Sequence, residues 1–254
     1  MIKLLHGDCL ERMKEIPDKS IDMILCDLPY GKTACKWDTI IPFNLLWEQY
    51  ERIIKDSGAI ALFGSEPFSS TLRLSNIKNY RYDWYWHKNR PTGGATSNKQ
   101  PMKCFETISM FYKIAPTYHP KMSSRTDVEL KKLSKNSLTK CDSELYGLNG
   151  YTQIRENLKE KYPTNYLNIK TVFSRGSEKV KHPTQKPVEL CEYFINTYTN
   201  EGETVLDNCM GSGSTGVACI NTKRNFIGIE KDDKYFEIAK SRIEKAQQDV
   251  APKV

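Results

Sequence analysis

Residues 204–216 read Thr-Val-Leu-Asp-Asn-Cys-Met-Gly-Ser-Gly-Ser-Thr-Gly, a short apolar run followed by a glycine-rich loop. The run predicts a buried strand, and residues 214–221 predict a helix that begins at the loop. Residues 225–230 predict a second strand, which ends at Glu230. Glycines at such a point let a ligand approach the backbone, and an acid at the end of the next strand can bind ribose hydroxyls. This context favours a nucleotide-cofactor site over a structural turn.

The glycine loop alone leaves the type of cofactor open. A dinucleotide would place its pyrophosphate at the helix N-terminus. S-adenosylmethionine, which has no phosphate, can use the same glycines and the same ribose-binding acid. A Walker-type phosphate loop is excluded, because no lysine follows the glycines.

The position of this loop in the chain decides the topology. Only 24 residues follow Glu230, which leaves room for one helix, from residue 232 to about 247, and a short tail. The other strands of a doubly wound sheet must therefore come from upstream, where apolar runs occupy residues 2–5, 21–26 and 59–63. The sequence predicts an α/β protein with a Rossmann-like sheet whose strand order is circularly permuted.

The stretch Asp27-Leu28-Pro29-Tyr30 directly follows the apolar run of residues 21–26. A proline cannot continue a strand ladder, so the strand ends here and a loop begins. Ligands of open α/β sheets bind at the carboxyl ends of the strands. We therefore expect Asp27–Tyr30 and the loop of residues 211–216 along one edge, with Asp8 just past the first strand. Taken alone, these four residues favour a simple strand-to-loop turn, because so short a pattern recurs by chance.

The remaining patterns complete the outline. Residues 9–16, 42–54, 67–75 and 187–200 predict helices, and residues 80–87 and 107–112 predict strands. Residues 31–41 and 89–103 read as polar loops, the first long enough to cover a site.

Between residues 117 and 181 the hydrophobic periodicity weakens. This segment holds 13 Lys or Arg against 7 Asp or Glu, so it carries nearly all of the net charge of +7. Basic residues interleaved with tyrosines suit a nucleic-acid groove, in which cations bind phosphates and rings stack on bases. The composition fits a solvated insertion equally well.

The bulk composition excludes several classes of protein. No apolar run approaches the roughly 20 residues that span a bilayer, and the N-terminal residues lack the features of a signal peptide. We therefore expect a cytoplasmic protein without membrane contact. None of the eight cysteines forms a C-x-x-C pair, so we expect reduced structural thiols and no metal site.

Five motifs, taken in order, resemble those of the DNA amino-methyltransferases that make N6-methyladenine or N4-methylcytosine. The order, with the D-x-P-Y motif first and the glycine loop last, is that of their β class. The motifs span most of the chain and are Gly7-Asp8-Cys9, Asp27-Leu28-Pro29-Tyr30, the residues His182-Pro183-Thr184-Gln185-Lys186-Pro187, Val205-Leu206-Asp207 with Gly211 to Thr215, and Phe226-Ile227-Gly228-Ile229-Glu230.

The resemblance implies a site-specific DNA methyltransferase that uses S-adenosyl-L-methionine and flips its target base out of double-stranded DNA. Residues 1–115 would form the catalytic half, residues 116–180 a target-recognition insertion, and residues 181–254 the cofactor-binding half. The resemblance leaves open a cognate restriction enzyme, as in restriction-modification systems, and a homodimer. An aspartate rather than a serine at position 27 favours adenine as the target.

The resemblance also implies catalytic roles. Asp27 and the carbonyl of Pro29 would accept the two hydrogens of the target amine, and Tyr30 would stack on the flipped base. Trp86 and Lys88 either line the base pocket or belong to the core. The lysines implied to bind DNA are Lys131, Lys132 and Lys135.

For the cofactor, Glu230 would bind the ribose hydroxyls, and Asp8 with the backbone of Cys9 would bind the adenine edge. Lys186 could instead be a surface lysine at the start of a helix, but its motif favours the cofactor role. The remaining implied contacts are those of Asp207, Gly211 and Gly213 with the methionine part, and of Thr184 and Lys186 with its carboxylate.

The sequence departs from the family pattern at two places. Leu28 stands where a proline is usual, and Asn208-Cys209-Met210 replaces a sequence similar to Pro-Phe-Ala. Three alternatives remain: an N4-cytosine DNA methyltransferase, a nicotinamide-dependent oxidoreductase, and a catalytically silent DNA-binding homologue. The oxidoreductase would leave Asp27–Tyr30 and the basic insertion unexplained.

Overall fold

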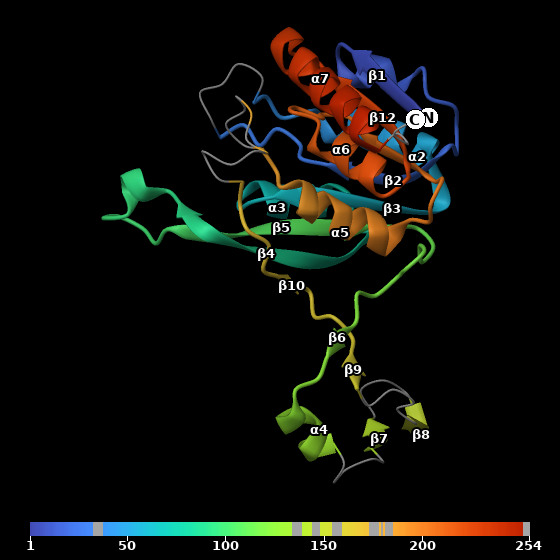
Figure 1. Ribbon diagram of the computed structural model, residues 1–254, viewed down its shortest axis with the longest axis vertical. Coiled ribbons are helices and arrows are strands. Elements are labelled where there is room, and N and C mark those ends of the chain that lie inside the picture. Colours follow the sequence, from blue (N-terminus) through green and yellow to red (C-terminus); the bar gives the residue numbers. More distant parts are fainter. Residues whose placement is uncertain are drawn as a thin grey trace. The chain divides into compact units, whose positions relative to one another are not determined.

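A computed structural model describes residues 1–32, 38–133, 139–143, 148–153, 159–172, 178, 180 and 185–250. Within these residues, eight strands form one sheet in the order β1-β12-β11-β2-β3-β5-β4-β10 (Figure 1). The strands of this sheet are β1 Ile2–His6, β2 Ile21–Cys26, β3 Ile54–Gly64, β4 Tyr80–Thr92, β5 Lys103–Phe111, β10 Tyr166–Leu167, β11 Thr204–Asp207 and β12 Asn225–Glu230.

The half of the sheet that carries the glycine loop is parallel. β1 pairs with β12, β12 with β11, β11 with β2 and β2 with β3, all in parallel. The carboxyl ends of these strands therefore meet at one edge of the sheet. Because β1 lies beside β12, the first and last strands of the chain are neighbours, and the predicted circular permutation is confirmed.

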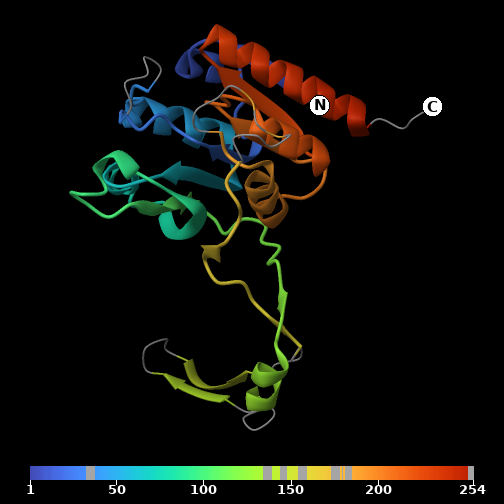
Figure 2. The ribbon, with the colours of Figure 1, turned by 60° about the vertical axis from the view of Figure 1, so that its left-hand side comes forward.

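Two layers of helices cover this sheet (Figure 2). Apolar side chains of α5 Val188–Tyr198, α6 Ser214–Asn221 and α7 Asp233–Val250 pack in one buried cluster on one face. A second cluster joins the other face to α1 Cys9–Met13, α2 Phe43–Ile53 and α3 Phe68–Ser75. Among the helices that the structure describes, none is long and apolar enough to cross a membrane.

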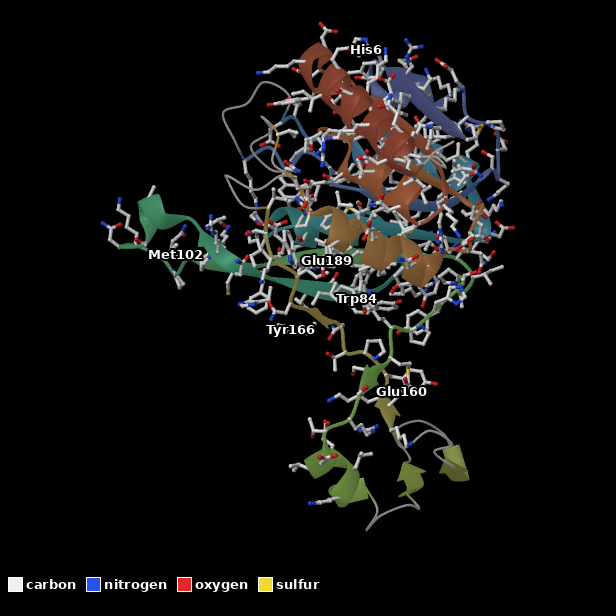
Figure 3. The ribbon with its side chains drawn as sticks, in the orientation of Figure 1. His6, Trp84, Met102, Glu160, Tyr166 and Glu189 are labelled. Atoms are coloured by element: carbon white, nitrogen blue, oxygen red, sulfur yellow. The ribbon has the colours of Figure 1, made fainter. Side chains whose placement is uncertain are left out.

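β4 and β5 form an antiparallel hairpin that extends past the sheet, with Met102 near its end (Figure 3). Both strands are longer than the sequence predicts, since pairing continues to Thr92 and Lys103 inside the expected polar loop. Strand β3 also begins early, at Ile54, where it pairs with Ile21 across a register shift. The residues of these segments are polar and do not predict strands by themselves. They adopt strand geometry because their backbones pair with a neighbouring strand. A short helix, η1 Gly94–Thr96, turns the hairpin.

Residues 120–164 form a second compact unit, and residues 1–119 and 165–254 form the first. The second unit lies within the segment that the sequence predicts as an insertion, residues 116–180. Its short elements are β6 Ser123–Ser124, α4 Asp127–Leu133, β7 Thr139–Ser143, β8 Leu148–Gln153 and β9 Glu160–Lys161. β6 pairs with β9, and Lys161 bridges to Glu129 at 2.7 Å, so both ends of the unit are tied together.

Candidate active site

The loop Asp27–Tyr30 leaves the sheet at the carboxyl end of β2, between β11 and β3. Leu28 is buried in the core beneath it and anchors the loop. The hydroxyl of Tyr30 donates to Oδ1 of Asp27 at 2.7 Å, while its ring lies against Phe68 with centroids 4.8 Å apart. The loop therefore presents a carboxylate whose one oxygen is already oriented by a neighbour three residues away.

The other oxygen of Asp27 is bound by Lys186, which precedes α5. Lys186 Nζ lies 2.5 Å from Oδ2 of Asp27 and 3.3 Å from Oε2 of Glu106. Burial raises the pKa of Asp27; Lys186 partly offsets this and Glu106 adds to it. Burial alone would lower the pKa of Lys186, but the two carboxylates outweigh it and raise that pKa above its ordinary value. The lysine therefore stays charged beside the carboxylate of Asp27.

The glycine loop between β11 and α6 is held by the acid at the end of β12. Gly211 and Gly213 adopt φ angles of +50° and +76°, in the region that favours glycine. The amide of Gly211 donates to Oε2 of Glu230 at 2.8 Å, and Oε1 accepts from the amides of Lys231 and Asp232. Burial raises the pKa of Glu230, and these three backbone donors counteract it. Glu230 thus fixes the glycine loop, and it lines the same cavity as Asp27.

Asp207, at the end of β11, is buried and bound on both oxygens. Oδ2 accepts from the hydroxyl of Thr215 at 2.7 Å and Oδ1 from the amide of Cys209 at 3.1 Å. Burial raises the pKa of Asp207 to about 7 despite these donors. Asp207 therefore ties the strand, the loop and α6 together at the floor of the site.

Asp8 follows β1 on the same edge. Its Oδ1 caps α1 by accepting from the amide of Leu10 at 3.0 Å, and its Oδ2 lies 3.1 Å from Nζ of Lys231. Gly7, whose φ is +134°, donates its amide to the carbonyl of Glu230. The ends of β1 and β12 are thereby joined, and Cys9 is buried just behind them.

These groups line one cavity of about 620 Å³, within the range of ligand-binding pockets. One set of lining residues comes from the glycine-loop half, and a second set comes from β4, β5 and the residues beside them. Of the predicted residues within the described part of the chain, the cavity brings together Asp8, Cys9, Asp27, Pro29, Tyr30, Lys186, Asp207, Gly211 and Glu230. Gly213 is not among the lining residues and is the N-cap of α6.

The sequence reasoning missed several charged residues of this cavity, among them Glu106. It stands opposite Trp86 in the β4–β5 register, and its Oε1 lies 2.9 Å from Nζ of Lys88. Trp86 is buried and donates to the carbonyl of Ile169 at 2.8 Å, so it is both a core residue and a cavity wall. Glu106 could have been found in the sequence as the acid within a strand that is otherwise rich in aromatic and apolar residues.

The roles predicted for four further residues stay predictions. Thr184 and Lys135 lie outside the described residues, as does the side chain of Lys132. Lys131 is exposed on α4 in the second unit. The prediction that Lys186 binds the carboxylate of the cofactor stays a prediction, because this ammonium contacts Asp27 and Glu106.

Comparisons with known proteins agree with this geometry. Residues 21–241 match the family N6_N4_Mtase, described as DNA methylase. The DNA adenine methyltransferase YhdJ of Escherichia coli (strain K12) is 31% identical over 96% of this chain and 83% of that protein. The Type II methyltransferase M.HinfI of Haemophilus influenzae is 27% identical over 94% of this chain and 67% of that protein.

A similar solved structure is the M1.HpyAVI–SAM complex. It has a TM-score of 0.64 and 26% sequence identity to this chain, covering 96% of this chain and 99% of that one. The similarity extends over the whole sheet and over both sets of cavity-lining residues.

Proposed function

This chain belongs to the DNA methylase family, and we propose that the base it methylates is adenine in double-stranded DNA, at the N6 amino group. Its methyl donor is S-adenosylmethionine. The observation that carries the choice of base is Asp27, a carboxylate in the wall of the cavity, with both oxygens oriented by neighbouring donors. The relative YhdJ is named a DNA adenine methyltransferase, which supports the same base.

The residues present fit the methyl donor. Glu230 and Asp8 offer carboxylate acceptors for ribose hydroxyls and for the adenine amine, and each lines the cavity. Gly211 adopts a left-handed φ at the rim, so the backbone there can be approached closely. When bound, S-adenosylmethionine supplies an electrophilic methyl group on a sulfonium. Asp207 and the backbone of Gly211 and Gly213 would hold its methionine part, with Thr184 and Lys186 at its carboxylate.

The residues of the Asp27 loop would activate the amine. The exocyclic nitrogen of adenine is a poor nucleophile, because its lone pair is delocalised into the ring. Asp27 and the carbonyl of Pro29 would each accept one N–H, which favours a pyramidal nitrogen with its lone pair free. Holding amine and methyl group in line supplies much of the acceleration. The proton leaves after the nitrogen has become cationic, so Asp27 need not be a strong base.

The target base must leave the duplex stack, at a cost of a few kcal/mol. Tyr30 would recover part of this cost by stacking on the flipped base. The walls formed by Trp86, Lys88 and Glu106 would then enclose it. Residues 116–180, which include the second compact unit, would read the DNA sequence, with Lys131, Lys132 and Lys135 on the phosphates.

We infer the wider context from the same family. A cytoplasmic location, a cognate restriction enzyme and a homodimer would each suit a DNA methylase. A nicotinamide-dependent oxidoreductase is set aside, because the chain belongs to the methylase family. An N4-cytosine enzyme differs only in the base it accepts, and a silent homologue would bind DNA without methylating it.

The test is methyl transfer from S-adenosylmethionine with a deuterated methyl group to unmethylated genomic DNA, followed by digestion to nucleosides and mass spectrometry. We expect deuterated N6-methyldeoxyadenosine. N4-methyldeoxycytidine would overturn the choice of base and keep the mechanism. No methylated nucleoside, with the methyl donor still bound in calorimetry, would show a catalytically silent protein.

A further inference from the structure

Asp27 belongs to a row of four side chains whose charges alternate in sign. In the order Asp27, Lys186, Glu106 and Lys88, successive N–O distances are 2.5, 3.3 and 2.9 Å. The members come from the end of β2, the residue two before α5, strand β5 and strand β4. Their side chains are 24%, 11%, 17% and 7% exposed. In such an environment charges interact more strongly than in water.

Glu106 is the member that links the two lysines. Its Oε1 accepts from Lys88 at 2.9 Å, whereas its Oε2 lies within ion-pair distance of Lys186 without a hydrogen bond. The backbone of Glu106 is fixed by its pairing with Trp86 in the sheet. A lysine, in contrast, has four rotatable bonds and takes its position from its partners. Glu106 therefore sets where the ammonium of Lys186 can lie.

The signs of the charges matter as much as the distances. With all four groups ionised the row is neutral, and each buried cation lies between or beside carboxylates. Without the charge of Glu106, the row would carry a net positive charge beside Asp27. Removing one partner of a buried ion pair leaves the other uncompensated.

We propose that Glu106 is a positioning residue for methyl transfer, which holds Lys186 on Oδ2 of Asp27 and so orients that carboxylate toward the target amine. This inference rests on the proposed function. The charge of Glu106 also offsets that of Lys186, so that Asp27 keeps its affinity for a proton. The titratable and charged groups around Asp27 are Lys186 before α5, Glu106 of β5, Cys26 of β2, Asp207 of β11 and Tyr30 of its own loop.

The proton step shows why this offset matters. The amine nitrogen bonds to the methyl group as the bond from that methyl group to the donor's sulfur breaks, with its electron pair left on sulfur; the nitrogen then carries a positive charge and an extra proton. One N–H bond then breaks, its electron pair returns to nitrogen, and the proton passes to a carboxylate oxygen of Asp27. Asp27 need not be a strong base in this step, but a lysine without its second carboxylate would compete more strongly for the oxygen that takes the proton.

The test uses the full chain with Glu106→Gln, which keeps the shape of the side chain and removes its charge. Single-turnover methyl transfer is measured from pH 5 to pH 9, with enzyme and S-adenosylmethionine in excess over DNA. We expect a rate about 100-fold lower, as for a misplaced catalytic group. We also expect the acid limb of the profile to move to lower pH, because the loss of a nearby negative charge lowers the pKa of Asp27.

A second variant, Lys88→Gln, should shift the acid limb of the pH profile in the opposite direction. It leaves Glu106 charged and takes a positive charge from the row, so the acid limb should move to higher pH. Shifts in opposite directions support the proposal. Acid limbs that stay in place in both variants, or that move the same way, would overturn it. If Glu106→Gln fails to fold, Lys88→Gln still tests the charge of the row, and Glu106→Asp, which keeps the charge but shortens the side chain, should lower the rate without the shift to lower pH; an unchanged rate in Glu106→Asp together with an unmoved limb in Lys88→Gln would overturn the proposal.

Two controls separate the proposal from other outcomes. Glu237→Gln, on the exposed face of α7, should leave rate and profile unchanged. The dissociation constant of S-adenosylmethionine for Glu106→Gln, measured by calorimetry, should stay within about twofold of that of the parent. A larger loss of affinity would show a merely structural role and overturn the proposal. If the parent chain itself transfers no methyl group, the proposed function fails; an active parent with an unaffected Glu106→Gln removes only the role of Glu106.

Discussion

The hydroxyl of Tyr30 lies 2.7 Å from Oδ1 of Asp27, so the aromatic ring and the carboxylate of one four-residue loop are hydrogen-bonded to each other. The carboxylate is thereby oriented before any base arrives. The ring cannot turn toward a base without changing this contact, so stacking and orientation are coupled in one residue.

Replacing Tyr30 separates these two contributions. Tyr30→Phe keeps the ring and loses the hydroxyl, so we expect the single-turnover rate to fall about tenfold while DNA affinity is retained. Tyr30→Ala also loses stacking, which contributes about 1–3 kcal/mol per base, and kcat/KM for DNA should fall about 10- to 100-fold further. Single-turnover rates, kcat and KM for DNA are measured for both variants. Equal losses of kcat/KM in the two variants would show that the ring does not stack on the base.

Asp27→Ala should abolish turnover and preserve the methyl donor's binding. Asp27 is the predicted acceptor of the amine hydrogens, and a positioned acceptor contributes at least about 100-fold. Methyl transfer and calorimetry on the same sample give both values. Asp18→Ala, which removes an exposed carboxylate near the other end of β2, is the matched control. Loss of donor binding in Asp27→Ala would instead make Asp27 a structural residue.

Gly213→Ala tests the start of α6. The residue has a φ of +76°, and a Cβ there would lie 3.0 Å from both Cα and Cβ of Ala239 in α7. We expect a loss of about 2–5 kcal/mol in the free energy of unfolding, from backbone strain and crowding together. Gly202→Ala is the control, since its φ is +83° and its Cβ would meet no atom within 4 Å. Urea unfolding of both variants gives the difference, and equal losses would mean that α7 yields to the new methyl group.

The stability of the protein should depend on pH through Asp207. Its folded pKa is raised from 3.8 to about 7, so between these values the folded state holds a proton that the unfolded chain has lost. The stabilising contribution of this carboxyl is therefore complete below about pH 4 and is lost as the pH rises through about 7.

Asp207→Asn cannot lose a proton, and its amide can accept from Cys209 and donate to Thr215. Relative to the parent, we expect the variant to gain stability between pH 5 and pH 8, on the order of a few kcal/mol. Urea unfolding of both proteins at each pH gives the comparison. A constant difference across this range would show that Asp207 titrates alike in both states.

The basic residues of the second unit should contribute to DNA binding through phosphates. Replacing Lys131, Lys132 and Lys135 by Gln should weaken binding and reduce the slope of log K against log salt by up to about 3. The matched control replaces Lys234, Lys240 and Lys245 on α7, which changes the net charge equally. A slope unchanged in the first variant, measured by fluorescence anisotropy on a DNA duplex, would remove these lysines from the interface.

The sheet was predictable because its signals are local and repeated. Apolar runs ending at Asp27, Asp207 and Glu230 placed three acids at carboxyl ends of strands. Because the strands pair in parallel, these ends meet at one edge of the sheet. The β4–β5 hairpin was underestimated, since polar residues such as Asn89 follow strand geometry only because the partner strand is there.

The interior of the site was less predictable than its frame. Glu106, Lys88 and Lys186 are distant in sequence, and no spacing rule relates them to one another. Their contacts depend on how β4 and β5 lie against the start of α5, which is a property of packing. The sequence could show that Lys186 belongs to a motif, but not that its ammonium lies on Asp27.

The pairing of β1 with β12 also sets when the protein becomes competent during synthesis. Residues Ile2 to His6 are made long before their neighbours in the sheet, Phe226 to Glu230. On the ribosome, β1 must therefore wait until the chain has been made as far as Glu230, and such long-range pairing is slow. A nascent or prematurely ended chain carries Asp27 without the loop and acid of the donor site. The capacity to modify a genome is thus withheld until synthesis has passed Glu230.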